Sequence, residues 1–526
     1  MSDRYDVIVA GAGHNSLVAA AYLSKAGFRC LVLESRSSVG GDTNTEELTL
    51  PGFRHDACST AHNLIQSSPL LRNDELHLGD YGLEYLHPDP VVHIPFPDGT
   101  WLTQWRDPQR TAEELGKFSK HDAGSYLKLL ADYEQVAPLY GRHRYTPIGW
   151  GPPMAELLAG HPEGRKWMRR QAMSAWQIIE NTFEDPHNRA FLLWMAFMTM
   201  QPADRPGTGA LAYSLVFGRQ RHSWTIPKGG SGALPTALVR LIEACGGTIL
   251  TKRRVTRLIV EGGRCTGVET AEGERFHAGR AVLSSIHIKH LIDMAPPEAW
   301  DDSFRFGVET WRPGVSMFVT HYATTEPPRF SVGTATLESL ASGTPGSVER
   351  MLEIGPQFSR REVDTEEPVL LVLCQTVADP SRAPAGKHTL KVVGFQPYEL
   401  PEGPDRWDEI EAKVSEANLN QLRRFAPNLT DEVILSRVIE SPLGLERFNE
   451  HNWHGSCHGG DQVLSQSSEL RPAPGWAAHR MPIDGLYQTG STTHPGGSVS
   501  GAPGRNAAMV MLKDLGSSLE EALANG

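Results

Sequence analysis

The first 34 residues place the tightest constraint on the fold, because they contain a complete β-α-β pattern. Residues 5–10 (YDVIVA) and 29–34 (RCLVLE) are short apolar runs, and residues 17–26 (LVAAAYLSKA) between them have the composition of a helix. A glycine turn at 11–16 joins the first run to the helix, and Gly27 follows the helix as a stop signal. This order predicts a Rossmann-type dinucleotide-binding domain.

The turn itself (GAGHNS) stands where backbone N–H groups and a helix N-terminus can face a pyrophosphate. Gly11 allows the tight turn and Gly13 permits close approach of the phosphates, while Ser16 replaces the usual third glycine. Glu34 ends the second strand, where its carboxylate can accept both hydroxyls of an adenosine ribose and repel a 2′-phosphate. These residues predict a cofactor that contains adenosine diphosphate.

Two more glycine-rich segments make the pattern specific. Gly40 and Gly41 follow shortly after Glu34 in ESRSSVGGDT, and residues 484–511 read DGLYQTGSTTHPGGSVSGAPGRNAAMVM. Together with the first turn, these segments resemble the FAD-binding segments of the amine oxidase and phytoene desaturase superfamily. Within it, the closest resemblance is to the pyridine nucleotide-disulfide oxidoreductase-like branch, and WTIPKGGSGAL (224–234) resembles another passage of the same family.

The resemblance implies noncovalently bound FAD. It implies that Gly490 and Ser491 lie beside the pyrophosphate and ribityl chain, that Val255 pairs with the adenine edge, and that the last helix directs its N-terminus at the pyrimidine edge of the flavin. The expected cofactor-binding residues are Gly11, Gly13, His14, Asn15, Ser16, Glu34, Ser35, Gly40, Gly41, Val255, Gly490, Ser491, Gly497, Ser498, Val499 and Ser500.

A chain of 526 residues is too long for one simple core, so we expect two interleaved domains. The fold class expected is α/β, with a Rossmann-type FAD-binding domain assembled from residues 1–69, 225–289 and 481–526. An α+β substrate-binding domain takes up 70–224 and 290–480. The Met-rich run at 191–200 (FLLWMAFMTM) fits ordinary core better than a cavity wall.

Candidate catalytic residues follow the glycine pair in GFRHDACSTAH (52–62). In the family, this segment runs under the flavin, so Asp56, Ser59 and His62 are candidates for the catalytic face. The alternative, that Asp56 and His55 only satisfy buried backbone groups, is equally open. Hydride transfer to a flavin can depend on position alone, so no residue is assigned as the general base.

Two other motifs carry less weight. The spacing of His451, His454, Cys457 and His458 could ligate zinc, but glycines crowd that loop and no carboxylate pattern accompanies it, so no metal is expected. Residues 207–212 (GTGALA) match a dinucleotide fingerprint formally, yet QPADRP rather than a strand precedes them. We therefore expect no second dinucleotide site.

Composition excludes several classes of partner and compartment. The net charge of −12 leaves no basic patch for nucleic acid. The six cysteines are far apart without a C-x-x-C pair, so neither a disulfide framework nor a redox dithiol is expected. No secretory signal precedes the first strand, and the longest apolar run is too short to span a bilayer. A cytoplasmic protein, with peripheral membrane contact as an option, is the expectation.

Three functions remain open at this point. The first is an FAD-dependent dehydrogenase or desaturase that takes hydride from a mostly apolar small molecule and passes electrons to oxygen, a quinone or another acceptor. The second is an isomerase in which the flavin cycles without net redox change, and the third is a redox-silent FAD-binding scaffold. Substrate identity, electron acceptor and oligomeric state are not encoded in any motif that we recognise.

Overall fold

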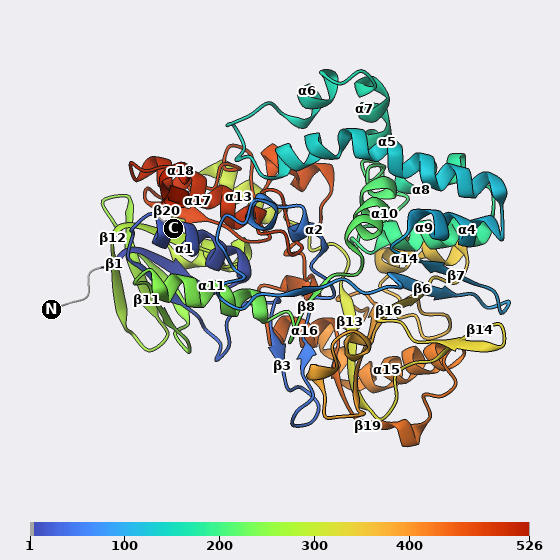
Figure 1. Ribbon diagram of the computed structural model, residues 1–526. Coiled ribbons are helices and arrows are strands. Elements are labelled where there is room, and N and C mark those ends of the chain that lie inside the picture. The colour runs from blue at the N-terminus through green and yellow to red at the C-terminus, as the bar shows by residue number, and fades with distance from the viewer. Residues whose placement is uncertain (1–4, 525–526) are drawn as a thin grey trace.

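The computed structural model describes residues 5–524 and contains two large β-sheets side by side (Figure 1). The first has the strand order β10-β11-β12-β1-β2-β9, and β20 pairs with β12. Its pairs β1–β2, β1–β12, β2–β9 and β12–β20 are parallel, whereas β10–β11 and β11–β12 are antiparallel. Its strands are β1 (Tyr5–Ala10), β2 (Cys30–Leu33), β9 (Thr248–Leu250), β10 (Val255–Glu261), β11 (Arg264–Thr270), β12 (Arg275–Ser284) and β20 (Leu486–Gln488).

Helices from both ends of the chain pack against this sheet. The helix α1 (His14–Lys25) packs between α11 (Ala233–Ala244) and α17 (Ala502–Asp514), and α18 (Leu519–Ala524) closes the same side. The approach of α17 to α1 is close, because a Cβ on Gly504 would lie 2.1 Å from the Asn15 carbonyl oxygen. Glycine at this position therefore lets α17 pack on α1.

The second sheet has the order β19-β13-β18-β17-β16-β6-β7 and is antiparallel except for the pair β16–β6. Side chains alternate between its two faces, as strand geometry requires. Val319, Leu371 and Val393 join the core under the helices, whereas Leu370 and Val392 face the opposite side. Its strands are β6 (Val92–Pro95), β7 (Trp101–Gln104), β13 (Met317–Thr324), β16 (Ala341–Thr344), β17 (Leu370–Leu373), β18 (His388–Phe395) and β19 (Ile434–Glu440).

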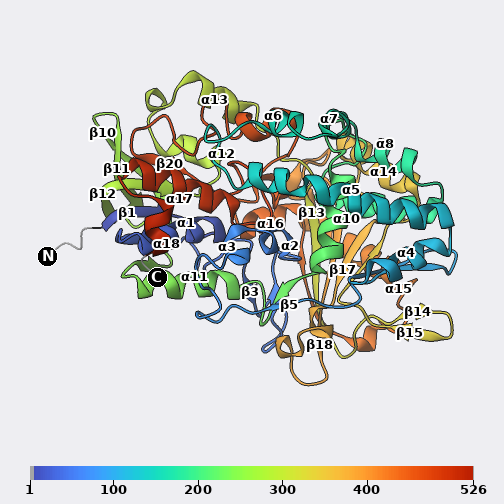
Figure 2. The ribbon, with the colours of Figure 1, turned by 45° about the horizontal axis from the view of Figure 1, so that its top comes forward.

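Helices cover the two faces of the second sheet unequally (Figure 2). A helical layer with the long α5 lies over one face, and α15 (Trp407–Arg423) packs on the other. The layer contains α4 (Pro108–Gly116), α5 (Lys120–Arg144), α6 (Met154–Ala159), α7 (Gly164–Ala172), α8 (Ala175–Thr182), α9 (Pro186–Phe197), α10 (Leu211–His222) and α14 (Val348–Arg360).

Short elements connect the two halves. The short strand pairs are β3 (Thr45–Glu46) with β4 (His55–Asp56), β5 (Tyr85–Leu86) with β8 (Ile226–Pro227), and β14 (Phe330–Val332) with β15 (Ala335–Leu337). The remaining α-helices are α2 (Asn63–Gln66), α3 (Pro69–Arg72), α12 (Ile288–Leu291), α13 (Asp302–Glu309) and α16 (Pro442–Phe448).

The expected α/β class and its discontinuous Rossmann-type sheet are confirmed, because strands from three separated parts of the chain form one sheet. The domain boundaries stay a prediction. The Met-rich run divides: Phe191–Phe197 is buried core of α9, whereas Met198 to Met200 line a cavity. Within residues 5–524, no helix is both long and apolar enough to cross a membrane.

Candidate functional site

A cavity of about 650 Å³ extends from the first glycine turn to the second sheet. One end is lined by Gly11, Glu34 and Val255, and the other by apolar side chains such as Leu215 and Phe395. Ligand sites commonly have volumes of about 300–1,000 Å³. The size of the cavity is therefore typical of a ligand-binding site.

The turn at the first end is shaped for close approach by a ligand. Gly11 has a φ of +96°, and a Cβ there would lie 2.5 Å from Ser285 Oγ. A Cβ on Gly41 would contact the Gly13 Cα at 3.4 Å, so the two glycine segments meet backbone to backbone. Ser16, at the third fingerprint position, donates from its hydroxyl toward the carbonyls of Gly11 and Gly13 at 2.6 and 2.9 Å. The serine hydroxyl thus stabilises the turn, and the glycines place no side chain on the side that faces the ligand.

Glu34 is buried at the end of β2 and supports the same turn. Its Oε2 accepts from the Ala12 N–H at 2.8 Å, and its Oε1 accepts from the Arg36 N–H at 2.9 Å. Oε1 also accepts from the Ser35 hydroxyl at 3.1 Å, so Oε2 is the oxygen with a lone pair left for a ribose hydroxyl. The carboxylate therefore fixes the turn and can also bind the ligand.

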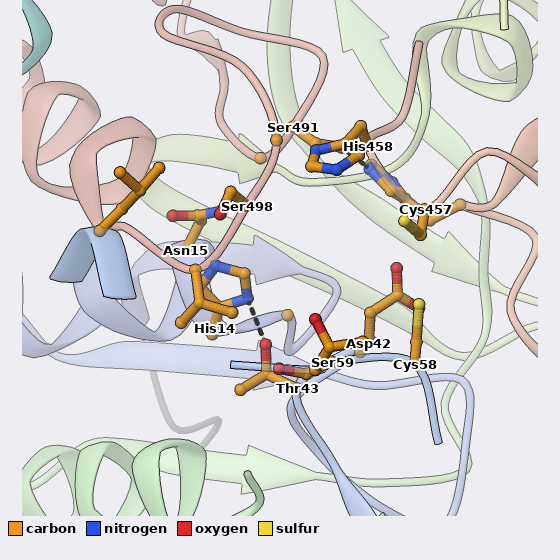
Figure 3. A pocket seen from close by; sticks show the side chains of 18 of the residues that line it. His14, Asn15, Asp42, Thr43, Cys58, Ser59, Cys457, His458, Ser491 and Ser498 are labelled. Carbon is orange, nitrogen blue, oxygen red and sulfur yellow. Dashed lines mark hydrogen bonds between the residues drawn. The ribbon is translucent and has the colours of Figure 1, made fainter. Parts of the chain in front are cut away.

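Polar atoms without partners gather farther along the cavity (Figure 3). His14 Nδ1 is 2.9 Å from the Thr43 hydroxyl, but His14 Nε2 and Asn15 Oδ1 are buried without a hydrogen-bond partner in the described chain. Burial and repulsion from His451 lower the pKa of His14 to about 4, which leaves its ring neutral at pH 7. Buried polar atoms are normally paired, so these fit a cofactor rich in polar atoms.

The expected cofactor-binding residues line this cavity, with the exception of Ser500. The Ser500 hydroxyl instead accepts from the Ala502 N–H at 3.2 Å at the start of α17. Contrary to expectation, the first turn of α17 (502–504) does not line the cavity; Gly497, Ser498 and Val499 of the preceding loop do. At this helix end, the Ala502 N–H is already bonded to Ser500, and Pro503 has no N–H to donate.

Two of the three expected catalytic residues lie away from the cavity. Asp56 accepts from Arg382 Nη1 at 2.7 Å, from the Thr45 hydroxyl at 2.7 Å and from the Ser231 N–H at 2.7 Å. His62 is buried within 3.2 Å of both Tyr85 and Ser231, and burial lowers its pKa to about 3. Both side chains use their hydrogen-bonding atoms to hold distant segments together, so we do not retain either as a catalytic candidate.

Ser59 does line the cavity, and its hydroxyl has no partner in the described chain. Next to it lies Asp42, which the sequence reasoning passed over although it directly follows the glycine pair. Asp42 Oδ1 accepts from Asn449 Nδ2 at 2.7 Å and from Asn452 Nδ2 at 3.0 Å. Burial nevertheless raises the pKa of Asp42 above its ordinary value. Its position in a cavity with a raised pKa marks it as a candidate acid or base.

From the sequence, Cys457 was considered only as a possible zinc ligand and Cys58 was not singled out. Cys58 and Cys457 line the same part of the cavity (Figure 3), and Cys457 Sγ lies 3.3 Å from Met200 Sδ. A hydrogen bond with Cys457 and burial raise the pKa of Cys58 well above its ordinary value, which keeps it a neutral thiol. The two thiols are far apart in sequence, so no spacing pattern could indicate that the fold brings them together.

The loop of possible zinc ligands spreads its side chains over different partners. His451 Nε2 is 2.5 Å from Ser491 Oγ, His454 stacks on Tyr398 at 4.5 Å, and His458 lines the cavity. Residues 207–210 form turns and residues 211 and 212 begin α10, so turns rather than a strand precede this helix. Neither motif forms the site that its spacing allowed.

A sheet with parallel central strands, a glycine turn at its strand ends, a buried acidic residue after the second strand and a second sheet across the cavity are typical of dinucleotide-dependent oxidoreductases with two domains. Residues 169–512 match the family described as flavin containing amine oxidoreductase, and residues 9–73 match the NAD(P)-binding Rossmann-like domain. The chain belongs to the flavin containing amine oxidoreductase family, and its cofactor is FAD.

Relatives of full length have several names. A limonene dehydrogenase subunit from Castellaniella defragrans is 26% identical, over 97% of this chain and 95% of that protein. Pyridine nucleotide-disulfide oxidoreductase domain-containing protein 2 of Mus musculus is 28% identical, over 98% and 94%. A lycopene-forming phytoene desaturase of Paracoccus is 25% identical, over 97% and 98%. The resemblance seen in the sequence is confirmed.

Proposed function

We propose that the protein dehydrogenates or desaturates a mostly apolar small molecule in the cavity between its two sheets. This proposal rests on one observation: a single cavity joins the glycine turns and Glu34 at one end to a group of apolar side chains at the other. When bound, FAD supplies the acceptor for a hydride from the substrate. Electrons then pass to oxygen, a quinone or another acceptor.

The far wall supports an apolar substrate. Met198 and Met200 from the end of α9, Leu215 and Phe217 from α10, and Leu371 and Phe395 from the second sheet contribute to it. Thioether and aliphatic side chains offer no specific hydrogen bond, so they bind a substrate mainly by excluding water from its apolar surface. The names of two relatives, a limonene dehydrogenase subunit and a phytoene desaturase, refer to hydrocarbons and agree with such a wall.

Dehydrogenation releases a proton as well as a hydride, and a carboxylate in the cavity wall can accept that proton. We place this role on Asp42, whose carboxyl lies beside Cys58 at the junction of the glycine-rich and apolar parts (Figure 3). The side chains of Asn449 and Asn452 hold one carboxylate oxygen in place by donating hydrogen bonds to it. A positioned base with a pKa nearer to neutrality transfers protons efficiently at physiological pH.

The test is anaerobic bleaching of the flavin absorbance in the purified holoprotein, with apolar alcohols, amines and polyenes as candidate substrates. At least one of them is expected to bleach the flavin in a single turnover, and admission of oxygen or a quinone is expected to restore the colour. A product of unchanged oxidation state would support an isomerase instead. A flavin that no candidate bleaches, but that dithionite reduces, would overturn the proposal.

A further inference from the structure

Six arginines line the cavity, and four of them have a carboxylate partner. Arg36 pairs with Glu46, Arg253 with Glu274, Arg254 with Glu450 and Arg447 with Asp408, at N···O distances of 2.5–2.8 Å. Within residues 5–524, Arg144 and Arg219 form no ion pair with a carboxylate. Arg144 is half-buried, so water can solvate its charge. Of these two arginines, Arg219 is the one that is buried as well as without a carboxylate partner in the described chain.

Arg219 stands in the last turn of α10 and is only 6% exposed. Its Nη1 donates to Asn63 Oδ1, a neutral acceptor, and its guanidinium carbon lies 3.6 Å from the ring centroid of Trp224. Its Nε is buried and has no hydrogen-bond partner in the described chain. The amide and the indole ring hold the guanidinium in place but do not neutralise it.

A buried, uncompensated charge is costly, and natural proteins pair such groups or use them. Burial lowers the pKa of Arg219 to about 9, which still leaves it protonated at pH 7. A free N–H on a fixed, planar guanidinium in a cavity wall is the arrangement that binds a planar anion. The missing counter-ion is therefore expected to come with a ligand.

We propose that Arg219 binds a carboxylate of the substrate, so that the substrate class is an apolar body with one anionic end. The proposal rests on the proposed function, because it assumes that the apolar wall binds the rest of the same molecule. Leu215 and Phe217 on α10 line the cavity next to Arg219 along the helix, which places apolar contacts beside the cation. A hydrocarbon would leave that cation unpaired.

The alternative roles for Arg219 are contact with FAD and support of the fold. The glycine segments that fit the FAD phosphates, around Gly11 and Gly41, belong to the first half of the site, whereas Arg219 stands on a helix over the second sheet. We therefore expect Arg219→Met to retain FAD at the wild-type ratio. A loss of FAD in this variant would overturn the assignment to substrate.

The decisive experiment titrates the oxidised holoprotein with octanoate and, in parallel, with 1-octanol, and follows the flavin absorbance. The two probes share a chain length and differ in charge. Octanoate is expected to bind roughly 10- to 100-fold more tightly than octanol, the range for a hydrogen bond to a charged group. Arg219→Met should abolish this difference, and Arg219→Lys should retain part of it.

Arg221→Met is the matched control, since Arg221 stands on the same helix but pairs with Glu134 outside the cavity. It should bind both probes like the wild type. Equal binding of octanoate and octanol by the wild type would overturn the carboxylate assignment and leave the proposed function intact. Failure of both probes to perturb the flavin would count against the apolar site itself, and the carboxylate assignment would fall with it.

Thermal unfolding separates a binding role from a structural one. If Arg219 were a structural residue, Arg219→Met would unfold at a lower temperature than the wild type without ligand. We expect an unchanged or higher unfolding temperature instead, because the substitution removes an uncompensated buried charge. Octanoate should raise the unfolding temperature of the wild type and of Arg221→Met, but not that of Arg219→Met.

Discussion

At the scale of single residues, Glu34 has two tasks: it accepts hydrogen bonds from backbone N–H groups of the turn, and it can accept one from a ribose hydroxyl. Glu34→Ala removes the acceptor for a ribose and also the partners of the Ala12 and Arg36 N–H groups, so we expect FAD binding to weaken by about 1–3 kcal/mol. Glu34→Gln keeps the size and one acceptor oxygen, and it should lose less. Fluorescence titration of the apoprotein with FAD measures both, and wild-type affinity in the alanine variant would show that Glu34 faces no ribose.

Asp42 carries the prediction for pH dependence at the same scale. Burial raises the pKa of its carboxyl, so the basic form needed to accept a proton becomes fully populated only above the ordinary aspartate range. The rate of anaerobic flavin reduction should therefore rise with pH through that raised pKa and then level off. Asp42→Asn should slow flavin reduction about 10²- to 10⁴-fold and remove this limb. An unchanged limb in a variant that retains FAD would assign the pKa to another group.

At the scale of elements, the ion pair of Asp56 with Arg382 joins β4 to the segment before β18, and Ser231 adds the loop before α11. Burial alone would raise the pKa of Asp56, but Arg382 and the hydrogen bond from Thr45 lower it to about 2. Because the folded pKa lies below the unfolded value, the stabilisation is complete above about pH 4 and is lost as the pH falls toward 2.

Asp56→Asn leaves Arg382 with Asp379 as its remaining carboxylate partner, at 3.2 Å. It should lower the free energy of unfolding at pH 7 by about 1–3 kcal/mol, while the rate of flavin reduction per FAD-loaded molecule stays near that of the wild type. Thermal unfolding and single-turnover reduction measure the two quantities. Asp42→Asn should show the opposite pattern, with a slow rate of flavin reduction and a free energy of unfolding near that of the wild type. A variant of Asp56 that is stable but inactive would restore Asp56 to the catalytic site.

At the scale of the whole molecule, the described chain has one turn of the dinucleotide-binding type, at residues 11–16. We assign this turn to FAD. The N-terminus of α10 at residues 207–212 follows turns rather than a strand, so it is not placed at the end of a sheet strand as a second dinucleotide site requires. We expect NADPH and NADH to reduce the bound flavin far more slowly than a true substrate does. Stopped-flow mixing under argon tests this, and rapid, saturable bleaching by either nucleotide would point to a reductase or monooxygenase.

Local sequence patterns predicted those parts of the protein whose structure depends mainly on residues close in sequence. The strand, turn and helix at 5–26 and the acidic end of β2 were predictable because each needs only a short segment with its own periodicity and turn chemistry. The glycines at 490 and 497 were found through a family pattern for the same reason. The sequence by itself thus determined the cofactor half, including most residues on its cavity wall.

Only the tertiary structure decided the chemistry of the other half. Asp42 meets Asn449 across 407 positions, and Arg219 meets Asn63 across 156, so no spacing rule connects them. Asp56 looked catalytic because its type and place were right, but its buried partner Arg382 is 326 positions away. The charge state and accessibility of a side chain depend on what packs around it, and in this fold those neighbours come from distant segments that only the two sheets bring together.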